Sequence, residues 1–340
     1  MTIAKPAAIL AFLLAAVIAA VGPVHAHTRN QEAGGTHLTT ISRPKLTDWF
    51  HKAGHGVFMH FLPGDAESLR KVEKFDVDAL ARQLQEVGAK YLVITLGQNS
   101  GYFISPNAAY DRMTGYQAGE RCSRRDLPLD LQKALKAKGI RLMLYLPAQV
   151  PNRDAGAQRS FGLPEGPQDQ PIDTNFAEKW AEIIQEWSDR YGDRVSGWWF
   201  DGCYRHVHFN DSIAKIYNAA VKHGNPRSIV AFNPGIELIH YSQFEDYTAG
   251  ETNEPFTVAP SGRFVDGSQW HCLTYLGASW GQRGTRYTAE QWAEWTKKVI
   301  SGGGVVTVDV GPNWDETAGP IGSISADQKA QLLAIKKAVR

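Results

Sequence analysis

The chain has 340 residues, and its 36 Lys and Arg against 35 Asp and Glu leave a formal net charge of +1 at pH 7. This balance implies neither a nucleic-acid-binding surface nor an acidic partner. Ten Trp and twelve Tyr are many for this length, and they indicate either a bulky core or an aromatic binding pocket.

The first 26 residues are predicted to be a secretory signal peptide. Lys5 precedes the apolar run 7–21, and Val24-His25-Ala26 resembles a cleavage site. The run is too short and wrongly flanked for a membrane anchor, and no later segment is apolar enough to span a bilayer. We therefore expect a mature protein that begins near His27, carries a polar leader over residues 27–45, and lies in the periplasm or outside the cell.

From residue 46 to residue 340, short apolar runs alternate with amphipathic stretches. The expected strands are Gly56–His60, Tyr91–Thr95, Arg141–Leu146, Val195–Phe200, Ser228–Phe232, a weak one near Tyr247, Cys272–Thr274 and Gly304–Val308. The expected helices are Val77–Val87, Leu129–Lys138, Phe176–Arg190, Ser212–Lys222, Ala289–Ile300 and Ala326–Val339. This alternation predicts βαβ units that form one α/β domain, a TIM-like (β/α)8 barrel. The poor periodicity of the fifth to seventh units predicts a distorted barrel. No glycine-rich dinucleotide motif follows the first strand, and no cofactor is expected.

Polar side chains gather at the predicted carboxyl ends of these strands, where barrels of this kind carry their chemistry. The residues with this placement are His60, Gln98, Asn99, Tyr145, Asp201, Asn233, Glu251, His271 and Asp309. Together they predict a polar pocket, and its expected aromatic lining is Trp199, Trp270 and Trp280. The run Trp198-Trp199-Phe200-Asp201-Gly202 is typical of glycosidic bond cleavage, because a carboxylate there meets developing positive charge beside a stacking wall. The alternative is an ordinary Asp that opens a turn.

Several segments match one enzyme family in order along the chain. They are Trp49-Phe50 with Gly56-Val57-Phe58-Met59-His60, Lys90-Tyr91-Leu92-Val93-Ile94-Thr95, Arg124-Arg125-Asp126, Trp199-Phe200-Asp201-Gly202, Asp246-Tyr247 with Glu251, Trp270 to Gly281, and Gly302 to Pro312. From Leu46 to the C-terminus the chain thus resembles glycoside hydrolase family 29, the α-L-fucosidases, without that family's C-terminal β-sandwich. The resemblance implies a fucosidase-type hydrolase with Asp201 as nucleophile, Glu251 as acid/base and His60 as a sugar contact.

One segment departs from the family. Where these enzymes usually have His-His-Asp-Gly-Phe, with histidines that hold the fucose hydroxyls, this chain has Gln98-Asn99-Ser100-Gly101-Tyr102. An amide donates and accepts hydrogen bonds without titrating. The resemblance therefore implies that a polar sugar is still held, either α-L-fucose or a relative such as L-galactose.

The predicted chemistry is retaining hydrolysis through a glycosyl-aspartate intermediate, which needs one ionised and one protonated carboxyl. Asp201 is the expected nucleophile, and Glu251 is the expected acid/base. The competing candidates for the acid/base are Glu254, Glu245 and Glu237. The expected substrate contacts are His60, Gln98, Asn99, Tyr145, Trp199 and Trp270.

Neither the histidines nor the cysteines form a metal motif. His206, His208 and His271 lack ligand spacing, so no metal is expected. Cys122, Cys203 and Cys272 leave at least one thiol unpaired, and the sequence does not choose a pair. The leading hypothesis is thus an exported glycoside hydrolase that acts on an oligosaccharide or polysaccharide. The alternative is a carbohydrate-binding protein on a glycosidase barrel that has lost the reaction, in which no carboxylate would face Asp201.

Overall fold

The computed structural model describes residues 43–166, 169–257 and 262–340. The predicted signal peptide and most of the predicted leader lie outside these ranges. A short helix, α1 (Arg43–Leu46), begins inside the range expected for the leader. None of the helices in the described ranges is long and apolar enough to cross a membrane.

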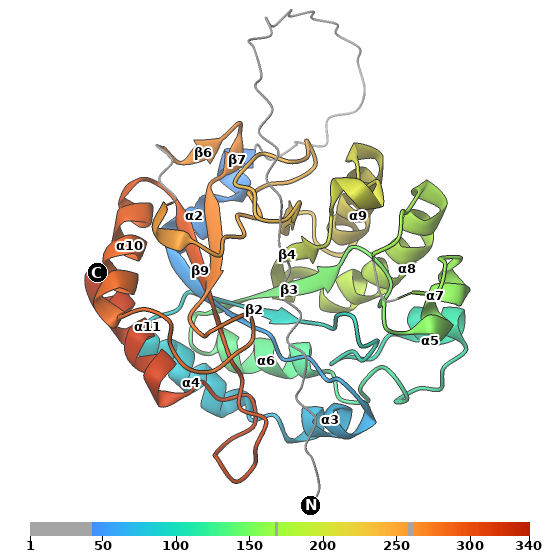
Figure 1. Cartoon of the computed structure of the whole chain (residues 1–340), viewed down its shortest axis with the longest axis horizontal. Coiled ribbons are helices and arrows are strands. Elements are labelled where there is room, and N and C mark those ends of the chain that lie inside the picture. The colour runs from blue at the N-terminus through green and yellow to red at the C-terminus, as the bar shows by residue number, and fades with distance from the viewer. Residues whose placement is uncertain (1–42, 167–168, 258–261) are drawn as a thin grey trace, which may run out of the picture. The chain divides into compact units, whose positions relative to one another are not determined.

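Within the described residues, seven parallel strands form the central sheet, in the order β5-β4-β3-β2-β1-β9-β8 (Figure 1). Their bounds are β1 (His55–Met59), β2 (Tyr91–Thr95), β3 (Arg141–Pro147), β4 (Val195–Asp201), β5 (Ile229–Phe232), β8 (His271–Tyr275) and β9 (Val305–Val310). A separate antiparallel pair is β6 (Phe264–Val265) with β7 (Ser268–Gln269). The parallel sheet agrees with the predicted (β/α)8 barrel in a single domain.

The segment 246–252 lies between β5 and β8, in the place of the one strand that the sheet lacks for a closed eight-stranded barrel. Its Asp246 N–H donates to the Val230 carbonyl of β5 at 2.7 Å, and its Gly250 carbonyl accepts from the Leu273 N–H of β8 at 2.9 Å. The weak strand expected near Tyr247 is thus reduced to isolated bridges. Gly250 explains the irregularity, because its φ is +63° and a Cβ there would lie 1.8 Å from a carbonyl oxygen.

Helices cover the outside of the sheet (Figure 1). Those expected from the sequence are α4 (Val77–Val87), α6 (Leu127–Lys136), α8 (Thr174–Tyr191), α9 (Asp211–Gly224), α10 (Ala289–Ser301) and α11 (Ala326–Ala338). The shorter helices are α2 (Asp48–Ala53), α3 (Ala66–Lys71), α5 (Ala108–Thr114) and α7 (Ala155–Phe161). Helix α8 shows why these stretches fold: Asp173 caps its first turn, and Trp180 and Trp187 on one face are fully buried.

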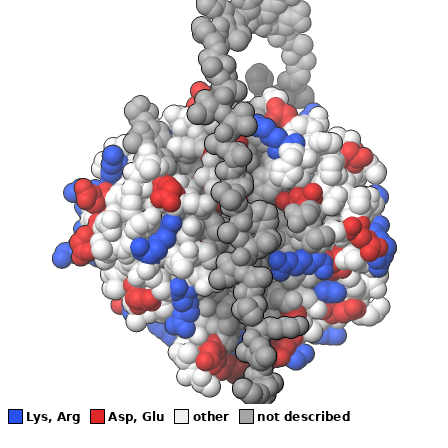
Figure 2. All heavy atoms as spheres, in the orientation of Figure 1, with Lys and Arg blue, Asp and Glu red and all other residues white. Residues whose placement is uncertain are grey.

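The strands separate two apolar layers. Successive side chains point to opposite faces, so one set packs between the sheet and the helices and the other fills the barrel interior. Phe58, Met143, Tyr145, Trp199 and Leu273 belong to the interior set. On the described part of the face that Figure 2 shows, positive and negative side chains are interspersed, in keeping with the net charge of +1.

Candidate active site

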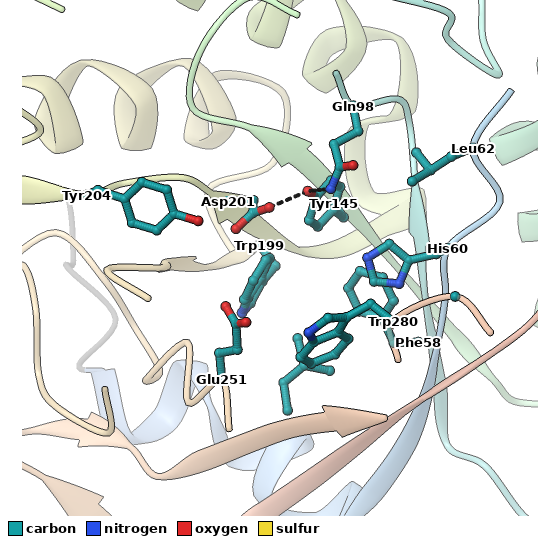
Figure 3. Close-up of a pocket in the computed structure, with 12 residues that line it drawn as sticks. Phe58, His60, Leu62, Gln98, Tyr145, Trp199, Asp201, Tyr204, Glu251 and Trp280 are labelled. Atoms are coloured by element: carbon teal, nitrogen blue, oxygen red, sulfur yellow. Dashed lines mark hydrogen bonds between the residues drawn. The ribbon is translucent and has the colours of Figure 1, made fainter. Parts of the chain in front are cut away.

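A cavity of about 500 Å³ lies at the carboxyl ends of the strands, and we call it the catalytic cavity. Its lining residues are Phe58, His60, Leu62, Gln98, Tyr145, Trp199, Asp201, Tyr204, Glu251, Leu273, Trp280 and Gly281. Ligand pockets of this size hold small molecules, with an apolar lining and a few placed polar groups. Figure 3 shows Asp201 and Glu251 on one side of this space and His60 and Trp280 on another.

Asp201 is the last residue of β4, so the strand holds its backbone in place. Its Oδ2 accepts a hydrogen bond from the Tyr145 hydroxyl at 2.5 Å, and its Oδ1 accepts from the Gly202 N–H at 2.8 Å. A third donor, the Asn233 side-chain amide, reaches Oδ1 at 3.0 Å. These donors fix the orientation of the carboxylate and stabilise its negative charge.

Glu251 faces the same space from the irregular segment 246–252. The amide nitrogen of Asn233 that donates to Asp201 also donates to Glu251 Oε2 at 2.5 Å. The two carboxyl oxygens can therefore be no farther apart than the sum of 3.0 and 2.5 Å. Asn233 is fully buried directly after β5, and its own N–H donates to the Phe200 carbonyl at 2.8 Å. One rigid amide thus holds both carboxyl groups.

The two carboxyl groups have different surroundings. Burial, and next the negative charge of Asp201, raise the pKa of Glu251 to about 7, against the opposing effects of the Asn233 hydrogen bond and of His60. A buried carboxyl beside a like charge keeps its proton, because ionisation would place two negative charges together in a poorly hydrated site. Glu251 is therefore a proton donor near neutral pH, next to a carboxylate that accepts three hydrogen bonds.

Gln98 and Tyr145 form a hydrogen-bonded chain to Asp201, drawn with dashed lines in Figure 3. The Gln98 Nε2 donates to the Tyr145 hydroxyl oxygen at 2.5 Å, and that hydroxyl donates to Asp201. An amide nitrogen can only donate a hydrogen bond, so the tyrosine oxygen accepts from Gln98 and the tyrosine O–H donates to the carboxylate of Asp201. Burial, and next the charge of Asp201, raise the pKa of Tyr145 well above its ordinary value, which keeps this proton in place.

His60 follows β1 and lies across the cavity from the carboxyl pair. Its Nδ1 is 2.9 Å from Oδ1 of Asp309, a residue of β9 that is 1% exposed. The other Asp309 oxygen accepts from the Gly281 N–H at 2.6 Å. Burial opposes the charged imidazole, but Asp309, Asp201 and Glu251 outweigh it and raise the pKa of His60. The acidic neighbours of His60 thus favour the protonated imidazole, which faces the cavity.

Aromatic rings form the apolar wall of the cavity. Trp199 stacks on Tyr145 with ring centroids 5.5 Å apart and an interplanar angle of 19°, and Phe58 meets both rings edge-on. Trp280 is partly exposed and lies 5.8 Å from the His60 ring. Such a wall beside charged groups matches a sugar, which has apolar C–H faces and polar edges.

A comparison with known protein families identifies the family of the chain. The family model described as alpha-L-fucosidase matches residues 64–337. The chain belongs to the α-L-fucosidase family. The matched range contains both carboxyl groups of the site. No curated protein matches the chain.

Solved structures share the fold of this α-L-fucosidase family member at low sequence identity. An α-L-fucosidase of family 29 from Bacteroides thetaiotaomicron is 19% identical, with a TM-score of 0.63 over 89% of this chain and 75% of that one. Isoenzyme 1 from Paenibacillus thiaminolyticus is also 19% identical, with a TM-score of 0.62 over 87% and 76%. The endo-fucoidan hydrolase MfFcnA4 of family 107 is 17% identical, with a TM-score of 0.66 over 86% of this chain. This chain spans about half the length of that hydrolase, 53%.

Most of the predicted site residues meet at the catalytic cavity. The structure brings together Asp201, Glu251, His60, Gln98, Tyr145 and Trp199. Asn99 lies beside this cavity and lines a smaller one next to it. Trp270 does not reach either cavity, because it packs outside the barrel, where its ring lies under Gly302 and Gly304. Strand alternation explains this placement: Leu273 points inward, whereas Trp270 and Cys272 point outward.

The competing carboxyl groups lie elsewhere. Glu254 and Glu237 are exposed, and Glu237 pairs with Arg205 at 3.4 Å. Glu245 is fully buried beside His240 and lines neither cavity. Glu251 therefore faces Asp201. The alternative of a carbohydrate-binding protein without activity predicted that no carboxylate would face Asp201.

Several residues of the site were not among the predicted contacts. The sequence placed Asn233 at a strand end and Trp280 in the aromatic lining, without a contact to substrate for either. No pattern in the sequence pointed to Leu62, Tyr204 or Leu273. His271 lies in the barrel core, where burial lowers its pKa to about 4 and its Nε2 is 2.6 Å from Thr307 Oγ1. Across the described ranges no group of three or more His, Cys, Asp or Glu could hold a metal ion. The three cysteines are buried and unpaired.

Proposed function

We propose that the protein is an exported, retaining glycoside hydrolase that releases a terminal α-L-fucose or a closely related sugar from a glycan. The observation that carries the proposal is the shared Asn233 amide, which limits the separation of the Asp201 and Glu251 oxygens. The limit is about 5.5 Å, the spacing of retaining enzymes, whereas inverting enzymes need about 6.5–9.5 Å to admit a water.

In the first step, the Asp201 carboxylate attacks the anomeric carbon and forms a glycosyl ester. The bond from that carbon to the leaving oxygen breaks, and Glu251 gives its proton to this oxygen. The pKa of Glu251, raised to about 7 by burial and by Asp201, keeps the proton available at near-neutral pH. The hydrogen bonds from Tyr145, Gly202 and Asn233 hold the attacking carboxylate in place.

In the second step, water attacks the same carbon and releases Asp201. Esterification removes the negative charge of Asp201, which is one of the two causes that raise the pKa of Glu251. Glu251, left as a carboxylate by the first step, is therefore less costly to keep ionised, and it takes a proton from the attacking water while the ester bond breaks and the carboxylate of Asp201 returns. The change in the charge of Asp201 thus explains how Glu251 acts as an acid in the first step and as a base in the second.

The remaining lining residues hold the sugar. His60, fixed by Asp309, offers an imidazole N–H to a ring hydroxyl, and Gln98 offers its side-chain oxygen as an acceptor. Trp280 and the interior rings provide the apolar wall for the C–H face. Because Gln98 does not titrate, this side of the site keeps its hydrogen bonds unchanged over the working pH range.

Export is the part of the proposal that rests on the sequence alone. It is supported by Lys5 followed by the apolar run 7–21, which lies outside the described residues. The direct check is N-terminal sequencing of protein recovered from the medium or periplasm of an expressing bacterium. A start near His27 is expected, and an intact N-terminus in the cytoplasm would contradict export.

The catalytic proposal is tested with a panel of aryl glycosides and natural oligosaccharides, with released sugars identified by chromatography. The wild type is compared with Asp201→Asn, which keeps the shape of the side chain but cannot form the ester. We expect release of one sugar by the wild type and almost none by the variant. More than a small fraction of wild-type activity in Asp201→Asn would overturn the assignment of the nucleophile.

A further inference from the structure

A second, smaller cavity adjoins the catalytic cavity on the side of Asp201. It has a volume of about 110 Å³, and we call it the side cavity. Its lining residues are Gln98, Asn99, Pro147, Gln149, Val150, Asn152, Asp169, Asp201, Gly202 and Tyr204. Gln98, Asp201 and Tyr204 line both cavities, so a ligand bound at Asp201 has access to each.

The side cavity lies on the nucleophile side of the site, away from the proton donor. Glu251 lines the catalytic cavity and is absent from the lining of the side cavity. In a double displacement the leaving group departs beside the acid, opposite the nucleophile. The occupant of the side cavity is therefore part of the sugar that becomes bonded to Asp201, and not part of the leaving group.

The lining is polar and has free hydrogen-bonding groups. Within the described part of the chain, the side-chain oxygen Oε1 of Gln98, the side-chain amide of Asn99 and the hydroxyl of Tyr204 have no hydrogen-bond partner. Asn152 holds Asp169 with an Nδ2 to Oδ1 distance of 3.4 Å, and Gln149 binds the backbone of Gln170 at 2.8 Å. These contacts give the cavity fixed walls and leave donors and acceptors for a ligand.

The lining also lacks positive charge. Of the described residues that line the side cavity, none is Lys, Arg or His, and two are aspartates. Burial, with the charge of Asp201, raises the pKa of Asp169, which shows how poorly this space tolerates a further negative charge. A neutral, hydroxyl-bearing group matches these walls, and a sulfate or carboxylate group does not.

The position of Asp201 identifies the ring atom concerned. Its carboxylate meets the anomeric carbon, and the neighbouring ring carbon that carries a hydroxyl is C2. We propose that the side cavity receives a neutral sugar substituent on O2 of the cleaved residue, so that the enzyme releases a 2-O-glycosylated sugar, as an intact disaccharide, in preference to a bare terminal one. This inference rests on the proposed function, since it takes Asp201 as the nucleophile.

The test compares three p-nitrophenyl α-L-fucosides: the bare glycoside, its 2-O-α-L-fucosyl derivative and its 2-O-sulfate. We expect kcat/KM for the 2-O-fucosyl compound to exceed that of the bare glycoside by about tenfold, and that of the sulfate to fall below it by about tenfold or more. Hydrolysis of the bare glycoside with none of the 2-O-fucosyl compound overturns the inference and leaves the proposed function standing. Hydrolysis of no fucoside or other aryl glycoside overturns both.

Variants of Asn99 test whether the preference for a 2-O-glycosylated substrate arises at the side cavity. Asn99→Leu removes an amide that lines the side cavity but not the catalytic cavity, and it is expected to lower the ratio of the two kcat/KM values about tenfold. Asn99→Ala repeats the loss of the amide without the added bulk. Asn175→Leu, on the exposed start of α8, is the matched control and is expected to leave the ratio unchanged. An unchanged ratio in both Asn99 variants overturns the role of this cavity.

Discussion

Replacement of Glu251 by Gln is expected to stabilise the fold at alkaline pH. In the folded wild type, burial and the charge of Asp201 raise the pKa of the Glu251 carboxyl from an ordinary 4.5 to about 7. Between these values the folded protein holds a proton that the unfolded chain has released, so stability falls as pH rises through this window. Each pKa unit corresponds to about 1.36 kcal/mol, which gives a cost of about 3 kcal/mol above pH 7. Gln carries no charge and avoids this cost.

The measurement is urea unfolding of the wild type and Glu251→Gln, followed by tryptophan fluorescence at pH 4.5 and pH 8. At pH 8 the free energy of unfolding of the variant should exceed that of the wild type by about 3 kcal/mol, and at pH 4.5 most of this difference should disappear. Glu254→Gln, on the exposed neighbouring carboxyl, is the control. The same difference at both pH values, or a variant that is less stable at pH 8, would refute the reasoning.

Three further outcomes are expected in kinetic assays. Wild-type kcat/KM should fall as pH rises through about 7, because Glu251 then loses the proton it must donate, and a profile that stays level to pH 9 would reassign the acid. Tyr145→Phe removes the donor to Asp201 Oδ2, so kcat/KM should drop about ten- to a hundredfold, and an unchanged value would show that the Gln98–Tyr145 chain has no catalytic effect. Bare p-nitrophenyl α-L-fucoside should be a poor substrate, because Gln98 and Asn99 stand where the family has histidines. Turnover at ordinary enzyme rates would contradict this prediction and would mean that the two amides also hold fucose.

The positions of the strands and the main polar residues could be predicted from sequence, because each depends on local patterns. Apolar runs bounded by turn residues located the seven strands to within one or two residues at most ends. The rule that barrel chemistry gathers at the carboxyl ends of strands then placed His60 and Asp201 together. These steps need no knowledge of which side chain contacts which.

The failures came where three-dimensional packing decides. Trp270 is one residue away from an inward-facing position, and the sequence did not show which face of the strand it takes. The segment with Glu251 is irregular because Gly250 approaches β8 too closely for any side chain, and no period in the sequence reveals that contact. The double role of Asn233 depends on two loops meeting at one amide, which a strand-end position alone does not predict.

The most direct test of the double displacement uses azide with two variants, Glu251→Ala and Asp201→Gly, and an activated aryl glycoside of the released sugar. Proton NMR then gives the anomeric configuration of the glycosyl azide. With Glu251→Ala, azide should intercept the glycosyl-Asp201 ester and yield the azide with the configuration of the substrate. With Asp201→Gly, azide should replace the missing carboxylate and yield the opposite configuration. The same configuration from both variants, or no azide product from either, would contradict the assignment of Asp201 as nucleophile and Glu251 as acid/base.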